Sequence, residues 1–390
     1  MGNKIRVGLV YGGKSGEHDV SLQTALAVIK AFDHQKYEIH PFYITKQGHW
    51  RTGPNLSGPV VSVASLTFEP LDHVDSSSME SYNGSTAVGA KQSAVRAIGS
   101  IFAQIEQSEL VKTRSSGTLD VVFPLLHGTF GEDGTIQGML EMADIPYVGA
   151  GVLASSVGMD KVMMKKVFAQ EGLPQCLYRH FTRVQWEKDE TYYLMEMERA
   201  LGYPCFVKPA NLGSSVGISK ARNRMELHKA ITFALQYDRK IIVEEFIDAR
   251  EIEVSVLGND SPETSIPGEI VPCNEFYDYK AKYVDGKSEM VIPADLPVEM
   301  IKKLQQLAIS AFEAIDCSGL ARVDFFVSRS DHSVYINEIN TMPGFTPFSM
   351  YPLLWRESGK SYAELLDQLI QLAMQRHEQK QRIQFSFDVG

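Results

Sequence analysis

Apolar runs separated by turn-forming residues divide the N-terminal part of this chain into strands and helices. Residues 5–11 have the continuous apolar pattern of a buried strand and end at the turn of Gly12 and Gly13. The following helix has an inner face that carries Ser21, Ala25, Val28 and Ile29. Residues 37–43 read as the next strand, so the chain opens with a βαβ unit.

Near the C-terminus, two apolar runs predict a β-hairpin that carries polar side chains in alternation. The runs at residues 320–327 and 334–339 are rich in Val, Ile, Phe and Tyr, and a polar segment separates them. Because side chains alternate across a sheet, Arg322 and Asp324 share one face, as do Glu338 and Asn340. Carboxylate and amide oxygens suit Mg²⁺, and the arginine suits an anion. A solvated edge hairpin is the alternative for each residue taken singly, but the four together favour a site.

Further elements follow the same reasoning. A nearly continuous apolar strand at 119–126 leads into a Gly-rich loop that begins at His127, and a strand that ends in such a loop is a typical edge of a ligand crevice. We also expect helices at residues 135–142, 298–314 and 362–377 and a strand at 241–247. On the strand that begins at Arg250, we expect Glu253 and Ser255 to face solvent.

A second candidate site lies in a β-rich segment that begins at Cys205. Lys208 ends a strand, and Gly213, Ser214 and Ser215 follow in a loop. Unhindered backbone N–H groups, hydroxyls and a lysine are the groups that a triphosphate needs. A hairpin turn with an exposed lysine is the alternative, and the distant candidate Mg²⁺ site makes it the weaker one.

Composition restricts the class of protein. The chain has 390 residues, 44% of them hydrophobic, which is enough for two or three α/β modules. A net charge of −10 argues against a nucleic-acid backbone as partner, so small molecules are expected. The four cysteines are scattered without a C-x-x-C pair, so neither a zinc cluster nor a disulfide framework is indicated. With neither an apolar run of membrane-spanning length nor a signal-peptide pattern, we expect a cytoplasmic protein without a membrane partner.

Two short motifs match nucleotide-binding patterns but stand in the wrong context. Residues 8–15 fit the P-loop expression, yet Gly8 lies within a strand and Glu17 and Asp19 would repel phosphates at the helix start. Residues 149–154 fit G-x-G-x-x-A, with Glu171 at the distance of a ribose-binding acid. A nicotinamide oxidoreductase is therefore a rival function, which the short preceding apolar stretch and the missing βαβ repeat disfavour.

Two remaining segments are irregular. Residues 72–117 begin Ser- and Gly-rich and predict a long surface excursion without catalytic residues, with a helical segment around 96–110. Residues 276–283 form an aromatic and basic loop for which nucleic-acid stacking is conceivable but fits the acidic chain poorly.

The hairpin motif R-x-D, followed by E-x-N-T-x-P-G, closely resembles the metal-binding end of ATP-grasp ligases, and the residues around it resemble the D-alanine–D-alanine ligase family. The resemblance runs from Lys4 to about Gln371 and is weakest in 72–117. It implies an α/β protein with the ATP-grasp fold and a Rossmann-like N-terminal (pre-ATP-grasp) domain. The implied modules are residues 1–149, a small lid domain at 150–247, and a C-terminal domain at 248–390 with an ω-loop and the metal site.

The resemblance also implies roles for individual residues. It assigns two Mg²⁺ ions, replaceable by Mn²⁺, to Asp324, Glu338 and Asn340. It places Glu17 and His127 on the first substrate, and Ser349 and Met350 on the carboxylate of the second. Arg322 and Gly344 would stabilise the tetrahedral intermediate, and Ser214 and Tyr283 would latch the ω-loop together with Glu17. The implied ATP contacts are Lys161, Lys208, Ser215, Glu244, Glu245, Ile247, Glu251 and Lys282, of which Glu244, Glu245 and Ile247 would read adenine.

The implied reaction is ATP-dependent ligation of two D-alanines through an acyl phosphate, for peptidoglycan precursors and hence cell wall biogenesis and cell shape. A homodimer is the family expectation. Tyr283 stands where ligases that use D-lactate have a histidine, so the dipeptide is the expected product. Carboxylases and peptide ligases of the same superfamily are a third possibility, and a non-enzymatic nucleotide sensor a fourth, disfavoured because all expected metal ligands are present.

Overall fold

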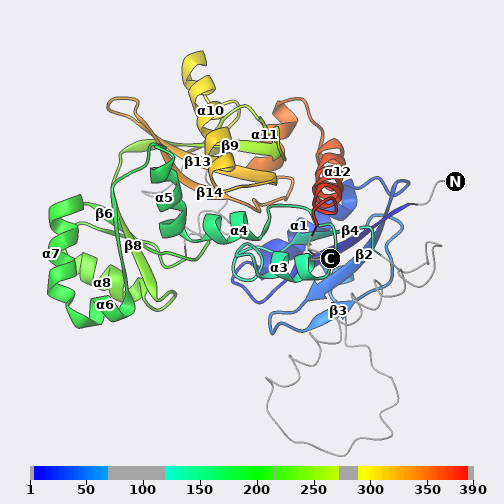
Figure 1. The fold of residues 1–390 in the computed structure, drawn as a ribbon, viewed down its shortest axis with the longest axis horizontal. Helices are drawn as coiled ribbons and strands as arrows, with labels where there is room; N and C mark the ends of the chain where they lie inside the picture. Colours follow the sequence, from blue (N-terminus) through cyan, green and yellow to red (C-terminus); the bar gives the residue numbers. More distant parts are fainter. Residues whose placement is uncertain (1–3, 69–118, 214–215, 272–288, 385–390) are drawn as a thin grey trace, which may run out of the picture.

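The computed structural model describes residues 4–68, 119–213, 216–271 and 289–384. These residues form three β-sheets with helices packed around them (Figure 1). The predicted excursion at 72–117, the ω-loop at 276–283 and the loop residues Ser214 and Ser215 lie outside the described residues.

The N-terminal sheet has the strand order β3-β2-β1-β4. Its strands are β1 (Ile5–Gly12), β2 (Tyr37–Ile44), β3 (Trp50–Thr52) and β4 (Val121–Leu125). β1 pairs in parallel with both β2 and β4, and helix α1 (His18–Ala31) carries the chain back across the sheet between β1 and β2. The predicted inner face of α1 is fully buried. A 3₁₀ turn, η1 (Val63–Leu66), follows β3, and helix α3 (Thr135–Met142) has the predicted bounds.

A second, wholly antiparallel sheet has the order β5-β8-β6-β7, and we call it the lid sheet. Its strands are β5 (Tyr178–Thr182), β6 (Cys205–Pro209), β7 (Ser219–Ala221) and β8 (Lys240–Glu245). Its helices are α6 (Arg183–Lys188), α7 (Glu190–Leu201) and α8 (Arg224–Ala234). They share a separate core with the sheet, built around Phe181, Trp186 and Val207. In Figure 1 this unit stands apart at the lower left, in green.

The largest sheet has the order β12-β11-β9-β13-β14, with β10 paired to β9. Its strands are β9 (Ala249–Gly258), β10 (Glu263–Thr264), β11 (Gly268–Val271), β12 (Glu289–Val291), β13 (Gly319–Ser328) and β14 (Val334–Asn340). Helix α10 (Val298–Ala314) has the predicted bounds and buries Leu304, Ala308, Ala311 and Phe312 against this sheet, at the spacing of one helix face.

The expectation that Glu253 and Ser255 face solvent is wrong. β9 lies inside the sheet and is covered on both faces: Val254 packs in the core with α10, and Leu257, which shares a face with Glu253 and Ser255, packs with Tyr351 and Leu365. Glu253 is 7% exposed and Ser255 is fully buried. Residue alternation alone could not reveal this, because the position of a strand within its sheet depends on distant segments.

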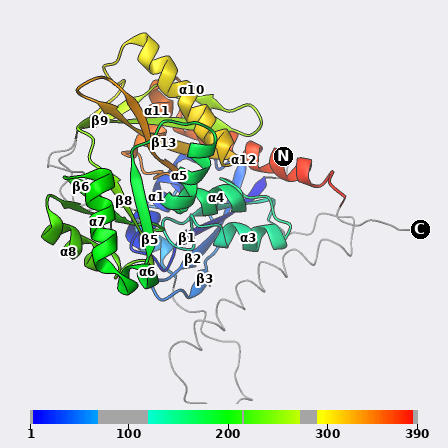
Figure 2. The same ribbon diagram turned by 60° about the vertical axis from the view of Figure 1, so that its left-hand side comes forward.

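Four further helices connect the sheets. Helices α4 (Val152–Met159) and α5 (Lys161–Gln170) contribute Ala154, Met164 and Phe168 to the core of the large sheet. Helices α11 (Met350–Glu357) and α12 (Tyr362–Lys380) join the core of the N-terminal sheet, where α12 lies beside that sheet in both views (Figures 1 and 2). Thus the N-terminal and largest sheets are joined by packed side chains and not only by the chain.

The structure explains both accidental motif matches. A Cβ atom at Gly12 would lie 2.1 Å from the carbonyl oxygen of Ile44, and the amide of Gly13 donates to that same oxygen at 2.8 Å. This turn therefore packs against β2 and does not open toward phosphates. At Gly149, whose φ is +103°, a Cβ would lie 2.8 Å from the side chain of Met342, so this glycine serves close packing against the protein's own core.

No helix in the described ranges is both long enough and apolar enough to cross a bilayer.

Candidate active site

One cavity of about 1020 Å³ lies where the three sheets meet. This volume is at the upper end of the range that small-molecule sites occupy. All predicted site residues within the described ranges line it: Glu17, His127, Lys161, Lys208, Glu244, Glu245, Ile247, Glu251, Arg322, Asp324, Glu338, Asn340, Gly344, Ser349 and Met350. Ser214, Ser215, Lys282 and Tyr283 lie outside the described residues. The structure thus brings together residues from every part of the chain, while their individual roles stay predictions.

The candidate metal ligands come from the predicted hairpin. In the pairing of β13 with β14, Asp324 stands opposite Glu338 and Arg322 opposite Asn340, so all four side chains share one face. The amide nitrogen of Asn340 donates to Oδ2 of Asp324 at 2.9 Å. Two carboxylates and an amide oxygen form the hard donor set that Mg²⁺ prefers. The described residues contain no cluster of three His, Cys, Asp or Glu side chains arranged for a metal ion.

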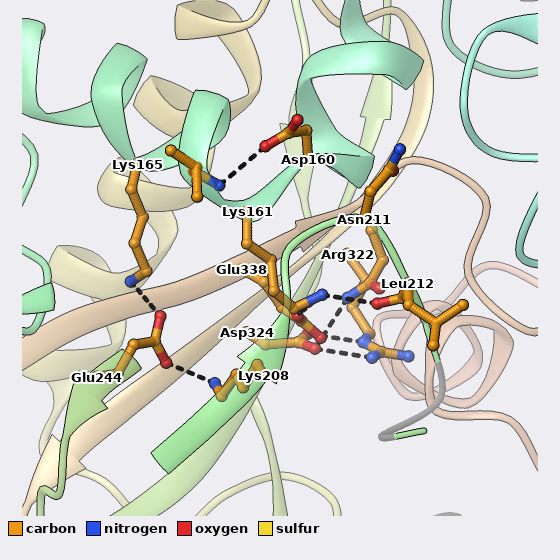
Figure 3. A network of polar contacts seen from close by, with 12 residues as sticks. Asp160, Lys161, Lys165, Lys208, Asn211, Leu212, Glu244, Arg322, Asp324 and Glu338 are labelled. Carbon is orange, nitrogen blue, oxygen red and sulfur yellow. Dashed lines mark hydrogen bonds and ion pairs between the residues drawn. The ribbon is translucent and has the colours of Figure 1, made fainter. Parts of the chain in front are cut away.

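Arg322 is held between two acids. Its Nε and terminal nitrogen donate to the two oxygens of Asp324 at 2.7 and 2.8 Å, and Nε lies 2.9 Å from Oε2 of Glu253. Burial opposes the charge, but Asp324 and Glu253 outweigh it and raise the pKa of Arg322 well above its usual value. The guanidinium is therefore permanently charged and fixed in orientation at the cavity wall (Figure 3).

Helix α5 positions Lys161 at the centre of the cavity. Asp160 caps the helix by accepting hydrogen bonds from the amides of Val162 and Met163, both at 3.1 Å. Lys161 Nζ donates to the carbonyl of Leu212 at 3.0 Å and lies 3.3 Å from Oε2 of Glu338. Lys161 thus contacts both the loop that contains Leu212 and Gly213 and a candidate metal ligand, Glu338.

Lys208 forms part of a buried group of three charges. Its Nζ lies 2.6 Å from Oε2 of Glu244, whose other oxygen lies 3.1 Å from Nζ of Lys165 (Figure 3). Burial raises the pKa of Glu244, but Lys165 and Lys208 outweigh burial and lower it to about 2. Burial likewise opposes the charge of Lys208, and Glu244 and Glu338 raise its pKa overall. All three groups are ionised at neutral pH.

The predicted base and ribose contacts line the same wall. The amide of Glu245 donates to the carbonyl of Leu177 at 3.0 Å. The backbone group of Glu245 that remains for hydrogen bonding to a base is therefore its carbonyl. Ile247 and Glu251 are half-buried at the cavity. The rings of Phe206 and Phe246, 6.2 Å apart, also line it and offer flat apolar surface to an aromatic ligand.

The N-terminal sheet contributes Glu17 and Glu132 to the part of the cavity that we call its acidic end. A Cβ atom at Gly128 would lie 2.8 Å from Oε2 of Glu17, and the amide of Gly128 donates to Oε2 of Glu132 at 2.5 Å. Burial, and next the charge of Glu17, raise the pKa of Glu132 well above its usual value. His127 is 4% exposed, and burial lowers its pKa although Glu17 opposes the shift, so its ring is neutral at neutral pH.

The predicted acceptor residues surround the start of α11. Ser349 is the N-cap of this helix, and its Oγ accepts from the amide of Thr346 at 3.0 Å. A Cβ at Gly344 would lie 3.0 Å from that Oγ, so this glycine lets the two segments approach closely. The first amides of a helix lack intrahelical partners, and the helix dipole favours an anion beside Met350.

Three charged residues at the site escaped prediction. Glu253 contacts Arg322, Glu132 lies beside Gly128, and Lys165 contacts Glu244. Only Lys165 had a usable local signal, since it stands four residues after Lys161 and therefore on the same face of one helix. The assembled cavity can bind phosphates at its cationic end, an ammonium at its acidic end and a carboxylate at α11.

Comparisons with known proteins agree with this arrangement. Residues 6–150 match the family model described as D-ala D-ala ligase N-terminus, and residues 167–371 match D-ala D-ala ligase C-terminus. The chain is 53% identical over 383 residues to the D-alanine–D-alanine ligase of Bacillus cytotoxicus, covering 98% of this chain and 99% of the relative. Among solved structures, it is similar to the D-alanine–D-alanine ligase from Coxiella burnetii, with a TM-score of 0.74 and 33% identity, covering 97% of this chain and 96% of that one. The VanG D-Ala:D-Ser ligase from Enterococcus faecalis gives a TM-score of 0.74 and 32% identity, with coverages of 95% and 100%.

Proposed function

Because the chain belongs to the D-alanine–D-alanine ligase family of ATP-grasp enzymes, we propose that it joins two D-alanines to D-alanyl-D-alanine with cleavage of ATP to ADP and phosphate. The product serves peptidoglycan precursor synthesis. The observation that carries the proposal is that one cavity brings together the cations Lys208 and Lys161, the carboxylates of Asp324 and Glu338, and Glu17. Phosphates, metal ions and a substrate ammonium require these three environments.

In the first step, the carboxylate of one D-alanine attacks the γ-phosphorus of ATP, ADP leaves, and an acyl phosphate forms. Lys161 and Lys208 neutralise the phosphate oxygens, and Glu17 holds the ammonium of the attacking D-alanine. The side chains act by position and charge, since no protein nucleophile is required. Neutral His127, buried beside this end with its Nε2 3.3 Å from the hydroxyl of Thr24, adds no charge to it.

In the second step, the amine of the other D-alanine attacks the acyl carbon, and phosphate leaves from the tetrahedral intermediate. Arg322 and the amide of Gly344 stabilise the oxyanion, and Ser349 with the first amide of α11 at Met350 holds the acceptor carboxylate. The permanent charge and fixed orientation of Arg322 suit it to this role.

The donor set also supports a place for two Mg²⁺ ions. Asp324, Glu338 and Asn340 would hold them, with Glu338 shared. When bound, the ions supply positive charge to the phosphate oxygens. The ATP contacts are completed by Glu244, Glu245, Ile247 and Glu251 at the base and ribose.

Product formation tests the proposal. Purified enzyme is incubated with ATP and Mg²⁺ and with D-alanine, L-alanine or no amino acid, while phosphate release is followed and the product is identified by mass. We expect phosphate release that depends on D-alanine and a dipeptide of two alanines. Phosphate release without dipeptide, or with L-alanine equally well, would contradict the assignment.

The acceptor is tested in the same assay by competition. D-Alanine, D-serine and D-lactate are supplied together near neutral pH, because a solved relative is a D-Ala:D-Ser ligase. The relatives at about half identity are D-alanine–D-alanine ligases, so D-alanyl-D-alanine is the expected main product. A majority of D-alanyl-D-serine or D-alanyl-D-lactate would overturn this acceptor preference.

Three broader statements belong to the same proposal. We assign the three modules to residues 1–149, 150–247 and 248–390, and each sheet lies within one of them. A homodimer is testable by light scattering on the purified chain. A cytoplasmic location fits the use of ATP and the three buried free thiols of Cys176, Cys205 and Cys317.

A further inference from the structure

Lys165 is a fully buried lysine that has no role in the proposed reaction. It follows Lys161 by one helical turn on α5, but only Lys161 lines the cavity. Lys165 therefore touches neither nucleotide nor amino acid. A buried ammonium is costly unless it is paired, so its partners indicate its purpose.

The partners of Lys165 come from the lid sheet and from the segment that leads into its strand β5. Its Nζ lies 3.1 Å from Oε1 of Glu244 on β8, donates to Sγ of Cys176 at 3.5 Å and stands 5.7 Å from the ring centre of Tyr178. Burial raises the pKa of Cys176 to about 11, so this thiol stays neutral. Glu244 is thus the anionic partner of Lys165 among these three neighbours.

The two carboxylate oxygens of Glu244 contact different lysines. Oε2 pairs with Lys208, the predicted phosphate contact, at 2.6 Å. Oε1 is buried from solvent and lies 3.1 Å from Nζ of Lys165. Because Glu244 nevertheless lines the cavity and a carboxylate oxygen has two acceptor positions, Oε2 retains capacity for a donor on a ligand beside Lys208.

We propose that Lys165 is a positioning residue for nucleotide binding, which holds the buried oxygen of the Glu244 carboxylate so that the other oxygen contacts Lys208 and is available to the amino group of the base. This inference rests on the proposed ATP site. With Lys165 as a second counter-ion, Glu244 stays ionised without turning wholly toward Lys208. Base recognition and phosphate binding are thereby linked through a lysine that contacts neither (Figure 3).

A purely structural ion pair is the competing explanation. Buried ion pairs contribute little net stability, because desolvation offsets the attraction between the charges. Loss of a structural pair would weaken binding of every nucleotide alike. Loss of a positioning residue would instead weaken selection of the base, so the ratio of affinities for two nucleotides separates the two explanations.

The test compares ATP with inosine triphosphate, which carries an oxo group in place of the 6-amino group. Affinities of both nucleotides are measured by calorimetry with Mg²⁺ for the unaltered chain, Lys165→Met and Lys166→Met. The neighbouring Lys166 is exposed on the same helix, so its loss removes the same charge without touching Glu244. We expect Lys165→Met to bind ATP about 10- to 100-fold more weakly, the usual loss when the partner that orients a binding group is removed, and to lose its preference for ATP. Lys166→Met should behave as the unaltered chain.

A second pair of variants keeps the test decisive if Lys165→Met folds poorly. Glu244→Gln and the double change of Glu244→Gln with Lys165→Met leave no unpaired carboxylate. We expect the ratio of the affinity for ATP to the affinity for inosine triphosphate to be the same in these two variants, because Lys165 acts through Glu244. Two results would overturn the positioning role. One is an affinity ratio in the double variant that is lower than in Glu244→Gln alone, and the other is an affinity ratio in Lys165→Met equal to that of the unaltered chain. An unaltered chain that bound neither nucleotide would overturn the proposed function itself, and the role of Lys165 with it.

Discussion

The two ends of the cavity differ in how their carboxylates are surrounded. At the nucleotide end, three carboxylates lie against cations: Glu244 contacts two lysines, Asp324 contacts Arg322, and Glu338 contacts Lys161. At the N-terminal end, burial and next the charge of Glu17 raise the pKa of Glu132. The nucleotide end is balanced before any ligand arrives, whereas the N-terminal end is an acidic pocket that a substrate ammonium would neutralise.

This difference indicates what each end contributes to the reaction. Preorganised cations at the nucleotide end need not rearrange when charge develops on phosphate, which is the condition for electrostatic catalysis. The acidic pocket instead selects a ligand, because the charge of Glu17 attracts an ammonium and repels an anion. Changes at the first end should therefore act mainly on turnover, and changes at the second on substrate affinity.

The largest effect is expected at the balanced end. Lys208→Ala removes a cation from the phosphates, and Glu338→Gln removes the carboxylate that contacts Lys161 and is proposed to bridge two ions. Each should lower turnover by about 100- to 1000-fold, the loss measured when one preorganised group is removed from a transition-state site. Phosphate release from ATP with D-alanine measures it, and circular dichroism checks the fold.

Lys14 provides the control for these variants. It belongs to the accidental P-loop match, but its side chain is exposed, and the turn beside it packs against β2. Lys14→Ala should leave turnover within a factor of about two, as expected for a surface change. Loss of ATP binding in Lys14→Ala, or normal turnover in Lys208→Ala, would move the phosphate site away from the lid sheet.

A smaller and more selective effect is expected at the acidic end. Glu17→Gln keeps the shape of the side chain but removes the charge that would hold the first ammonium. We expect kcat/KM for D-alanine to fall about 10- to 100-fold, equivalent to one charge-assisted hydrogen bond of about 1.5–3 kcal/mol, with KM for ATP nearly unchanged. Initial rates at varied D-alanine and varied ATP measure both. Equal losses for both substrates would remove the distinction between the two ends.

The same comparison explains what the sequence could predict. Arg322, Asp324, Glu338 and Asn340 were placed correctly on one face because alternation along two neighbouring strands is local information. The bounds of α3 and α10 were predicted correctly because their apolar periodicity is also local. Such patterns identify elements and the faces of a hairpin.

Contacts between distant segments were beyond that reasoning. Glu253 was placed in solvent because nothing local shows that distant segments cover both faces of β9. Glu132 was missed because its interaction with Glu17 depends on how two loops of the N-terminal sheet approach each other. Lys165 was missed, although it lies one turn after Lys161, because its partner Glu244 lies on the distant strand β8. Glu253 and Lys165 are both charged and buried, a combination that only tertiary structure creates.

The smallest effect expected is on stability at the acidic end. The pKa of Glu132 is raised in the folded chain, so the unfolded chain ionises this group more readily. Its contribution to stability is complete below the pKa of the unfolded carboxyl, near 4.5, and is lost as pH rises toward the raised folded value. Glu132→Gln removes this loss and can still accept the hydrogen bond from Gly128.

Glu132→Gln should therefore be more stable than the unaltered chain at pH 8, by about 0.5–2 kcal/mol, and gain less at pH 5. Urea unfolding of both proteins at the two pH values, without nucleotide or amino acid, measures the difference. Asp133→Asn is the matched control, because Asp133 adjoins Glu132 but its carboxylate accepts from the amides of Phe130 and Thr135 within its own loop. A gain that is equal at both pH values, or larger at pH 5, would show that the acidic end carries no repulsion, and the contrast between the two ends would then rest on Glu17 alone.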